Sequence, residues 1–299
     1  MYVITGSTGN TGRTVAETLL SKGEKVRAIG RSASRLQPLT TKGAEAFVAD
    51  LSDAKALTKA FKGARAVYAM VPPNVTSTDY RAEQELLGDA IAKAVKDAGV
   101  EFAVSLSSVG ADKPEGTGPV AGLHSFEKKL NEIKGLNVLH LRPGYFMENT
   151  LAQIQPIRLI QASAGPLRPD LKVPMIATRD IGAAAADALL QLNFRGQQIR
   201  ELLGQRDLDY TEVAGVIGDA IGESNLPYVQ VSDDQFVSAV QQAGMSKNMA
   251  DLILEMAKAL NSGYMVALET RSAKNSTPTT FETFVAEEFI PAYRQTAAA

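Results

Sequence analysis

Three glycines near the amino terminus form the clearest chemical pattern in the chain. Gly6, Gly9 and Gly12 are spaced three apart and follow the apolar run 2–5 directly. In such a turn the first glycine permits a tight bend, the second lets backbone amides approach a diphosphate, and the third lets a helix pack closely on a strand. The helix amino terminus then favours the anion. The pattern predicts a dinucleotide-binding turn, with an ordinary surface loop as the alternative, and the expected contacts are Gly6, Thr8, Gly9, Asn10, Thr11 and Gly12.

The residues about 20 positions further on indicate which dinucleotide is bound. A protein specific for NAD places an acid at the end of the second strand, against the ribose hydroxyls. Residues 26–35 contain no acid, and Arg31 and Arg35 lie there instead. Because guanidinium groups bind phosphate through charge-assisted hydrogen bonds, we expect NADP(H). The alternative is that both arginines belong to a solvated loop. Asp50 and Leu51 close the third expected strand and are predicted to meet the adenine, although Asp50 could instead cap the next helix.

The elements that must position these residues alternate regularly through the first half of the chain. Short β-branched or apolar runs alternate with longer amphipathic stretches, which is typical of repeated βαβ units. A glycine follows each of four expected helices, where a left-handed cap is wanted. The pattern predicts a Rossmann-type, doubly wound parallel sheet that binds ligands at the carboxyl ends of its strands. Strands are expected at 2–5, 25–30, 44–48, 66–71, 102–107 and 137–141, and helices at 11–21, 54–61, 79–98 and 120–133.

After residue 149 the pattern changes to helical segments interrupted by short extended pieces. Strands are expected at 172–176, 198–203 and 228–231, and helices after Arg179-Asp180 and over 240–262 and 281–293. We therefore expect two regions packed as one structural unit. Residues 1–149 form the dinucleotide-binding domain, and residues 150–299 form a smaller, mixed substrate-binding region.

Composition excludes several classes of protein. The hydrophobic fraction of 45% and the charged fraction of 21% are near globular averages. A net charge of -2 without a basic stripe argues against nucleic acid. The chain has no cysteine, and its two histidines are far apart, so thiol chemistry and a metal site are not expected. No apolar run reaches the roughly 18 residues of a membrane span, and no secretory signal is apparent. We expect a cytoplasmic monomer or homodimer that acts on a small molecule.

Several further motifs carry a family resemblance. With Ser107-Ser108, the string 141–149 (LRPGYFMEN), the string 178–182 (TRDIG) and the ending 280–284 (TFETF), the chain resembles the NmrA-like branch of the atypical short-chain dehydrogenase/reductases nearly end to end. The resemblance implies a Rossmann fold that binds NADP(H). It also implies an oxidoreductase such as an NADPH-dependent quinone reductase, a triphenylmethane dye reductase, or an alkene or ether reductase. The same branch includes redox-sensing regulators that bind the dinucleotide.

The expected catalytic residues depart from the common short-chain pattern. Typical members have a Ser after the fifth strand and a Tyr-x-x-x-Lys on the next helix. Here Ser107 matches the Ser, but His124 stands at the Tyr position, four residues before Lys128 and on the same helix face. The resemblance implies that Lys128 holds the nicotinamide ribose and that Val71 and Pro72 contact the cofactor. His124 or a water would supply a proton, the alternative being a surface or capping histidine.

The missing tyrosine bears on the substrate. Reduction of a simple ketone and nucleotide-sugar epimerisation both need a strong proton donor or base. A reduced quinone resembles a phenolate with a pKa of about 10, which pocket hydrogen bonds or water can manage. We therefore expect hydride transfer from NADPH to a quinone-like or other conjugated acceptor, with Pro73, Tyr145, Phe146 and Asn149 lining its pocket. The aromatic pair could instead anchor the smaller region. The alternative functions are an NADP(H)-binding redox sensor with little turnover and, less favoured, a nucleotide-sugar epimerase.

Overall fold

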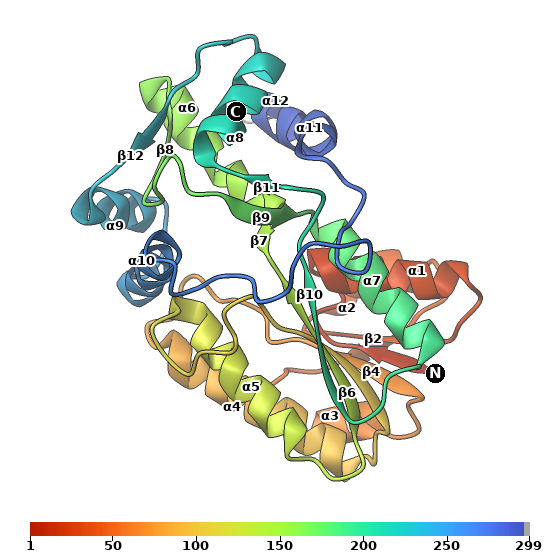
Figure 1. Ribbon diagram of the computed structural model, residues 1–299. Coiled ribbons are helices and arrows are strands. Elements are labelled where there is room, and N and C mark those ends of the chain that lie inside the picture. The colour runs from red at the N-terminus through yellow and green to blue at the C-terminus, as the bar shows by residue number, and fades with distance from the viewer. Residues whose placement is uncertain (296–299) are drawn as a thin grey trace.

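The computed structural model describes residues 1–295 and is built around a seven-stranded parallel sheet (Figure 1). The sheet order is β10-β6-β5-β4-β1-β2-β3. Because the strand order reverses between β1 and β4, the ligand-binding crevice of a doubly wound sheet falls at their carboxyl ends. The predicted Rossmann-type fold is confirmed. The strands are β1 (Tyr2–Ile4), β2 (Val26–Gly30), β3 (Glu45–Val48), β4 (Ala66–Ala69), β5 (Phe102–Leu106), β6 (Asn137–Pro143) and β10 (Gln197–Leu202).

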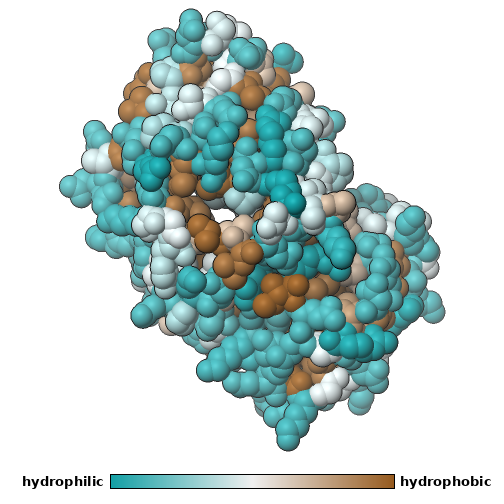
Figure 2. Space-filling model, viewed as in Figure 1, coloured by the Kyte–Doolittle hydropathy of each residue, from teal (hydrophilic) through white to brown (hydrophobic). Residues whose placement is uncertain are grey.

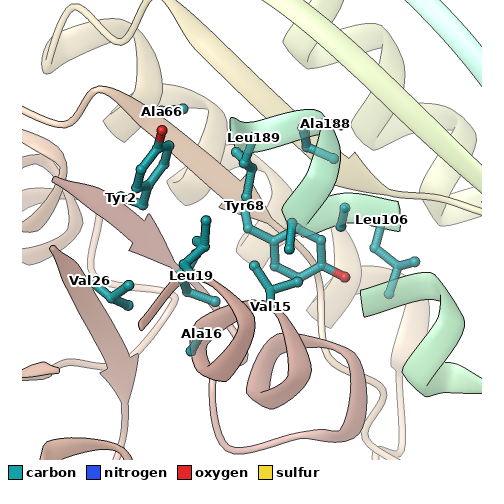
Figure 3. Close-up of a cluster of buried hydrophobic side chains, with 14 of the residues drawn as sticks. Tyr2, Val15, Ala16, Leu19, Val26, Ala66, Tyr68, Leu106, Ala188 and Leu189 are labelled. Carbon is teal, nitrogen blue, oxygen red and sulfur yellow. The ribbon is translucent and has the colours of Figure 1, made fainter. Parts of the chain in front are cut away.

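Helices cover both faces of this sheet, because its strands alternate buried side chains between two apolar cores. Tyr2 and Ile4 of β1 pack with α1 (Asn10–Ser21), α2 (Ala33–Thr40) and α7 (Thr178–Gln191). Figure 3 shows part of this core, with Tyr68 of β4 beside Val15 of α1. Val3 points to the opposite face, which is covered by α3 (Ala54–Phe61), α4 (Tyr80–Asp97) and α5 (Ala121–Asn131).

The smaller region is mixed, as expected, and has its own core. Its three-stranded sheet comprises β7 (Tyr145–Phe146), β9 (Val173–Ile176) and β11 (Asp207–Leu208), and its two-stranded sheet pairs β8 (Ser163–Gly165) with β12 (Tyr228–Gln230). Around them lie α6 (Ile154–Ile160), α8 (Tyr210–Ile221), α9 (Asp233–Gln242), α10 (Lys247–Asn261), α11 (Phe281–Phe284) and α12 (Ile290–Gln295). The 3-10 turn Gly118–Val120 leads into α5, the 3-10 turn Met147–Gln153 leads into α6, and the π turn Val285–Phe289 joins α11 to α12.

The second half of the chain also completes the larger sheet. α7 packs against α1, and β10 pairs in parallel with β6. Polar contacts tie the carboxyl-terminal segment to α7, since the Asp180 carboxylate accepts hydrogen bonds from the amide and the hydroxyl of Thr279. A division at residue 149 therefore does not separate the two regions, because α7 and β10 follow that residue but belong to the Rossmann region. Figure 2 shows the surface hollowed between the smaller region and the Rossmann sheet, with hydrophobic residues at the rim.

The local predictions hold where a glycine ends a helix. Gly23, Gly63 and Gly99 directly follow the C-cap residues of α1, α3 and α4 and have positive φ, between +68° and +77°, as left-handed caps require. The cap predicted at Gly135 is wrong, because α5 ends earlier, at Asn131, and Gly135 lies in the turn beyond it. The helix predicted over 240–262 is wrong, because it is two helices. α9 begins earlier, at Asp233, and ends before Gly244, whose φ of +94° breaks the helix. α10 then starts afresh, with the Ser246 hydroxyl accepting a hydrogen bond from the amide of Met249.

Two further differences lie around the second and third strands. α2 was not predicted, because it is a short helix with Pro38 inside it. The cap of α3 is Asp53, which accepts hydrogen bonds from the amides of Lys55 and Ala56, so the capping alternative for Asp50 is wrong. No helix in residues 1–295 combines the length and the apolar character needed to span a lipid bilayer.

Candidate functional site

The glycine turn has the geometry that diphosphate binding requires. Gly6 has a φ of +60°, and a Cβ there would lie 2.2 Å from the sulfur of Met70. A Cβ at Gly12 would lie 2.3 Å from the Gly6 carbonyl oxygen, so only glycine lets α1 begin this close to β1. Gly9 is exposed, and the nearest atom to its added Cβ would be the Gly6 oxygen at 3.4 Å. The space outside Gly9 is therefore open to a ligand.

Hydrogen bonds fix this turn to the neighbouring strands. The Ser7 hydroxyl donates to the Ile29 carbonyl at 2.8 Å, at the end of β2. The Tyr68 hydroxyl donates to the Thr11 hydroxyl at 3.0 Å. Burial raises the pKa of Tyr68, so its hydroxyl keeps its proton and this bond. The turn is thus held in place by β2 and β4 before any ligand binds.

A positively charged surface lies beside the turn, at the ends of β2 and β3. Arg31 and Arg35 are exposed, and within residues 1–295 neither guanidinium has a hydrogen bond or an ion pair. The Asp50 carboxylate accepts hydrogen bonds from the Ser52 hydroxyl at 2.7 Å and the Ser52 amide at 2.8 Å, which lower the pKa of Asp50, and Arg31 adds to this effect. Arg13, which was not singled out from the sequence, is exposed on the first turn of α1.

Ser107 lies at the end of β5 and contacts an ion pair that the sequence analysis missed. Its hydroxyl donates to Glu127 Oε1 at 2.5 Å. Arg142 binds the same carboxylate through two hydrogen bonds, of 2.9 Å and 2.6 Å. One signal was available: an arginine after the apolar run 138–141 of a buried strand needs a buried acid as partner.

His124 and Lys128 lie on α5 but differ in their surroundings. His124 is half-buried, and its Nδ1 lies 2.8 Å from the Ala111 carbonyl oxygen. Since a carbonyl can only accept, Nδ1 carries a proton and, in the neutral ring, Nε2 keeps a lone pair. Lys128 is exposed, and it is Glu127 that contacts Ser107.

The residues expected to meet the nicotinamide and the acceptor follow β4 and β6. Val71 is buried, Pro72 half-buried and Pro73 exposed. Tyr145 packs against Tyr210, with ring centroids 6.4 Å apart, and burial raises the pKa of Tyr145 while its hydrogen bonds with Tyr210 and Asn149 oppose this. Phe146 packs against the sheet core instead. The aromatic pair therefore joins the two cores, and Asn149 is exposed beside it.

Comparison with known proteins defines the class. The family model of the NmrA-like family matches residues 2–289, and the chain belongs to that family. It is 29% identical to an NAD(P)H azoreductase of Xenophilus azovorans over 258 residues, 86% of each chain. It is 30% identical to a (4-alkanoyl-5-oxo-2,5-dihydrofuran-3-yl)methyl phosphate reductase of Streptomyces griseus over 200 residues, 66% of each chain.

Solved structures agree with this class. An NADPH-dependent quinone oxidoreductase of Escherichia coli, complexed with NADPH, superposes with a TM-score of 0.81 and 25% identity, covering 97% of this chain and 100% of the other. A Citrobacter triphenylmethane reductase complexed with NADP(H) has a TM-score of 0.79 at 19% identity, covering 96% and 99%, and shares the fold.

Proposed function

We propose that this protein transfers a hydride from NADPH to a quinone-like or other conjugated small-molecule acceptor. It is an NAD(P)H-dependent oxidoreductase of the NmrA-like family, and its cofactor is NADP(H). The observation that carries the proposal is the open glycine turn together with two exposed arginines, Arg31 just after β2 and Arg35 in α2, which form no ion pair within residues 1–295.

The residues present fit the cofactor at its adenosine and diphosphate end. The diphosphate would meet backbone amides outside Gly9, at the amino terminus of α1, where the helix dipole favours anions. Arg31 and Arg35 would hold the 2′-phosphate, which neutralises two exposed positive charges. Asp50 and Leu51 would border the adenine. This distribution of charge favours NADPH over NADH.

At the other end of the cofactor site the chain's residues orient and shield the reacting groups. Bound NADPH supplies the hydride. Val71 and Pro72 would contact the nicotinamide from the end of β4, and Pro73, Tyr145, Phe146 and Asn149 would border the acceptor. The hollow between the sheet and the smaller region gives the acceptor a partly apolar approach (Figure 2). Positioning in such a cleft supplies much of the rate enhancement that a hydride transfer needs.

The shortage of free proton donors in the site favours a conjugated acceptor. His124 donates its Nδ1 proton to the Ala111 carbonyl, so its Nε2 can deliver a proton only from the imidazolium form. Ser107 donates to Glu127. A simple alkoxide product needs a strong donor, whereas the anion of a reduced quinone resembles a phenolate with a pKa of about 10, so water can supply its proton. The names of the azoreductase and quinone oxidoreductase relatives are consistent with this substrate class.

The test is a panel of acceptors mixed with the purified full-length protein and NADPH, followed by nicotinamide absorbance. We expect oxidation of NADPH by quinones, azo dyes or enones, and none by simple aliphatic ketones. Binding of NADPH without turnover on any acceptor would contradict the proposed reaction. A preference between NADP and NADPH in that case would favour the redox-sensor alternative.

A further inference from the structure

Ser107, Glu127 and Arg142 form a closed polar network within the core, at the carboxyl ends of β5 and β6. Their exposed fractions are 3%, 5% and 6%. Glu127 Oε1 accepts from both the Ser107 hydroxyl and Arg142 Nε, and Oε2 accepts from the second guanidinium contact. Asp112 and Glu201 add negative charge near Arg142. The guanidinium thus lies among acids, and the network is an ion pair with one serine attached.

The network fixes the direction in which the Ser107 hydroxyl points its hydrogen. A carboxylate whose oxygens face two guanidinium N–H groups can only accept hydrogen bonds. A serine hydroxyl has one hydrogen and two lone pairs. Because the hydrogen goes to Glu127, Ser107 has only lone pairs left for any ligand.

We propose that Ser107 is a hydrogen-bond acceptor for an N–H or O–H group of the bound ligand, and that Glu127 and Arg142 are positioning residues that impose this role. Its neighbour β4 ends at Ala69, just before Val71 and Pro72, so Ser107 lies where the nicotinamide and the acceptor are placed under the proposed function, on which this inference rests. Two groups there could donate: the carboxamide N–H of the nicotinamide and a hydroxyl on the acceptor. To polarise an oxygen of the acceptor instead, Ser107 would have to donate its hydrogen to that oxygen, but this hydrogen is already donated to Glu127.

The test compares wild type with Ser107→Ala on ligands that do or do not carry the donor group. The first pair is NADPH and its reduced 3-acetylpyridine analogue, in which an acetyl group without N–H replaces the carboxamide. The second pair is a hydroxylated quinone and the same quinone without hydroxyl. The inference predicts that Ser107→Ala weakens the Kd or raises the KM by about fivefold to tenfold for the donor-bearing member of at least one pair. The member without the donor should change less than twofold.

The matched control is Ser108→Ala, because the Ser108 hydroxyl donates to the Val109 carbonyl and does not contact Glu127. We expect this variant to bind all four ligands as wild type does. An equal loss with Ser107→Ala on donor-bearing and donor-free ligands would overturn the inference, as would no loss on any of them. Wild-type protein that bound NADPH but oxidised it with no acceptor would contradict the proposed function alone, because the dinucleotide pair still reads out the hydrogen bond.

Glu127→Gln tests the positioning role. Its amide can donate to Ser107, which would free the serine hydrogen and reverse the direction of the hydroxyl. We expect this variant to lose the preference for the donor-bearing ligand, and Ser107→Ala to have little further effect in its background. Retention of that preference in a folded Glu127→Gln protein would overturn the role of Glu127. If the unpaired Arg142 prevents folding, Ser107→Ala still decides the inference.

Discussion

At the residue scale, the candidate site combines two exposed arginines with side-chain donors whose hydrogens are already used in hydrogen bonds within the protein. Neither Arg31 nor Arg35 forms an ion pair within residues 1–295, although Arg31 is near enough to Asp50 to help lower the pKa of that carboxyl group. His124 donates a hydrogen bond to the Ala111 carbonyl, and Ser107 donates one to the Glu127 carboxylate. The site therefore has exposed cations that could receive the proposed 2′-phosphate, but few free proton donors. That balance suits a reaction in which the cofactor carries the chemistry and the product anion is delocalised.

Arg31→Asp tests the assignment of the 2′-phosphate. Because the change replaces attraction by repulsion, we expect NADPH affinity to fall about 10-fold to 100-fold while NADH affinity changes much less. Calorimetric titration measures both. Lys96→Asp, in the last turn of α4, is the charge-matched control and should bind both dinucleotides normally. An equal effect of Arg31→Asp on NADPH and NADH would remove Arg31 from this role.

His124→Phe tests proton delivery from the imidazolium. If Nε2 supplies the proton, wild-type kcat falls as rising pH removes the imidazolium, because only the charged ring carries a proton there. By that route the variant would have a lower kcat and would lack this step, whereas protonation by water, which the proposed function favours, predicts the same kcat for both proteins. The measurement is kcat against pH for one quinone at saturating NADPH. Superimposable pH profiles would assign the proton to water.

At the element scale, the alternation of strands and helices was predictable because each βαβ unit buries a continuous apolar strand between amphipathic helices. The glycine turn and three of the four glycine caps were equally predictable, since Gly6 and the caps have positive φ and Gly12 leaves no space for a Cβ. The pair Glu127 and Arg142 was not, because the partners are 15 residues apart and meet only when α5 packs on β6. Lys128 could not be placed from the sequence for the same reason. Helical spacing puts it on the same face as His124, but the packing of α5 buries Glu127 against Ser107 and leaves Lys128 exposed. Packing equally decides that Tyr145 meets Tyr210.

Gly12→Ala tests the close approach of α1 to β1. The added Cβ would lie 2.3 Å from backbone, which cannot move without shifting the turn. We expect a loss of about 1–3 kcal/mol in the free energy of unfolding and at least tenfold weaker NADPH binding. Gly215→Ala, inside α8 with nothing within 4 Å, is the control, and it should be neutral or stabilising. Equal behaviour of the two variants in denaturation and in titration would refute the packing argument.

His140, in the interior of β6, gives the fold a pH dependence. Its ring nitrogens contact the Ser105 hydroxyl and the Asn131 amide oxygen, and its side chain is 1% exposed. Burial lowers the pKa of His140 to about 4; the Glu127 carboxylate opposes this shift, and Arg142 adds a smaller lowering effect. An unfolded histidine titrates near 6.5, so between these values the unfolded chain binds the proton and the folded protein does not.

The free energy of unfolding should therefore fall by up to about 3 kcal/mol through this residue as pH drops from about 6.5 to about 4. Urea denaturation across that range measures the change. His140→Gln, which removes the titrating group, should show a shallower fall than wild type. Identical slopes for the two proteins would show that His140 does not contribute.

At the scale of the whole molecule, the two regions are joined because the second half of the chain returns to the sheet. β10 and α7 extend the Rossmann layers, and Asp180 holds the carboxyl-terminal segment against α7. The aromatic pair at the start of the smaller region reaches both cores. The smaller region is thereby fixed against the carboxyl ends of β4 and β5, where the proposed function puts the nicotinamide and the acceptor.

The most direct test of this arrangement is a single turnover. The protein is first loaded with no more than one equivalent of NADPH and is then mixed rapidly with excess quinone. The absorbance of the reduced nicotinamide is followed with time. We predict a first-order loss of that absorbance, with a rate that saturates in quinone and is much faster than the reaction in free solution. Bound NADPH that keeps its absorbance in the presence of every quinone and dye tested would contradict the account.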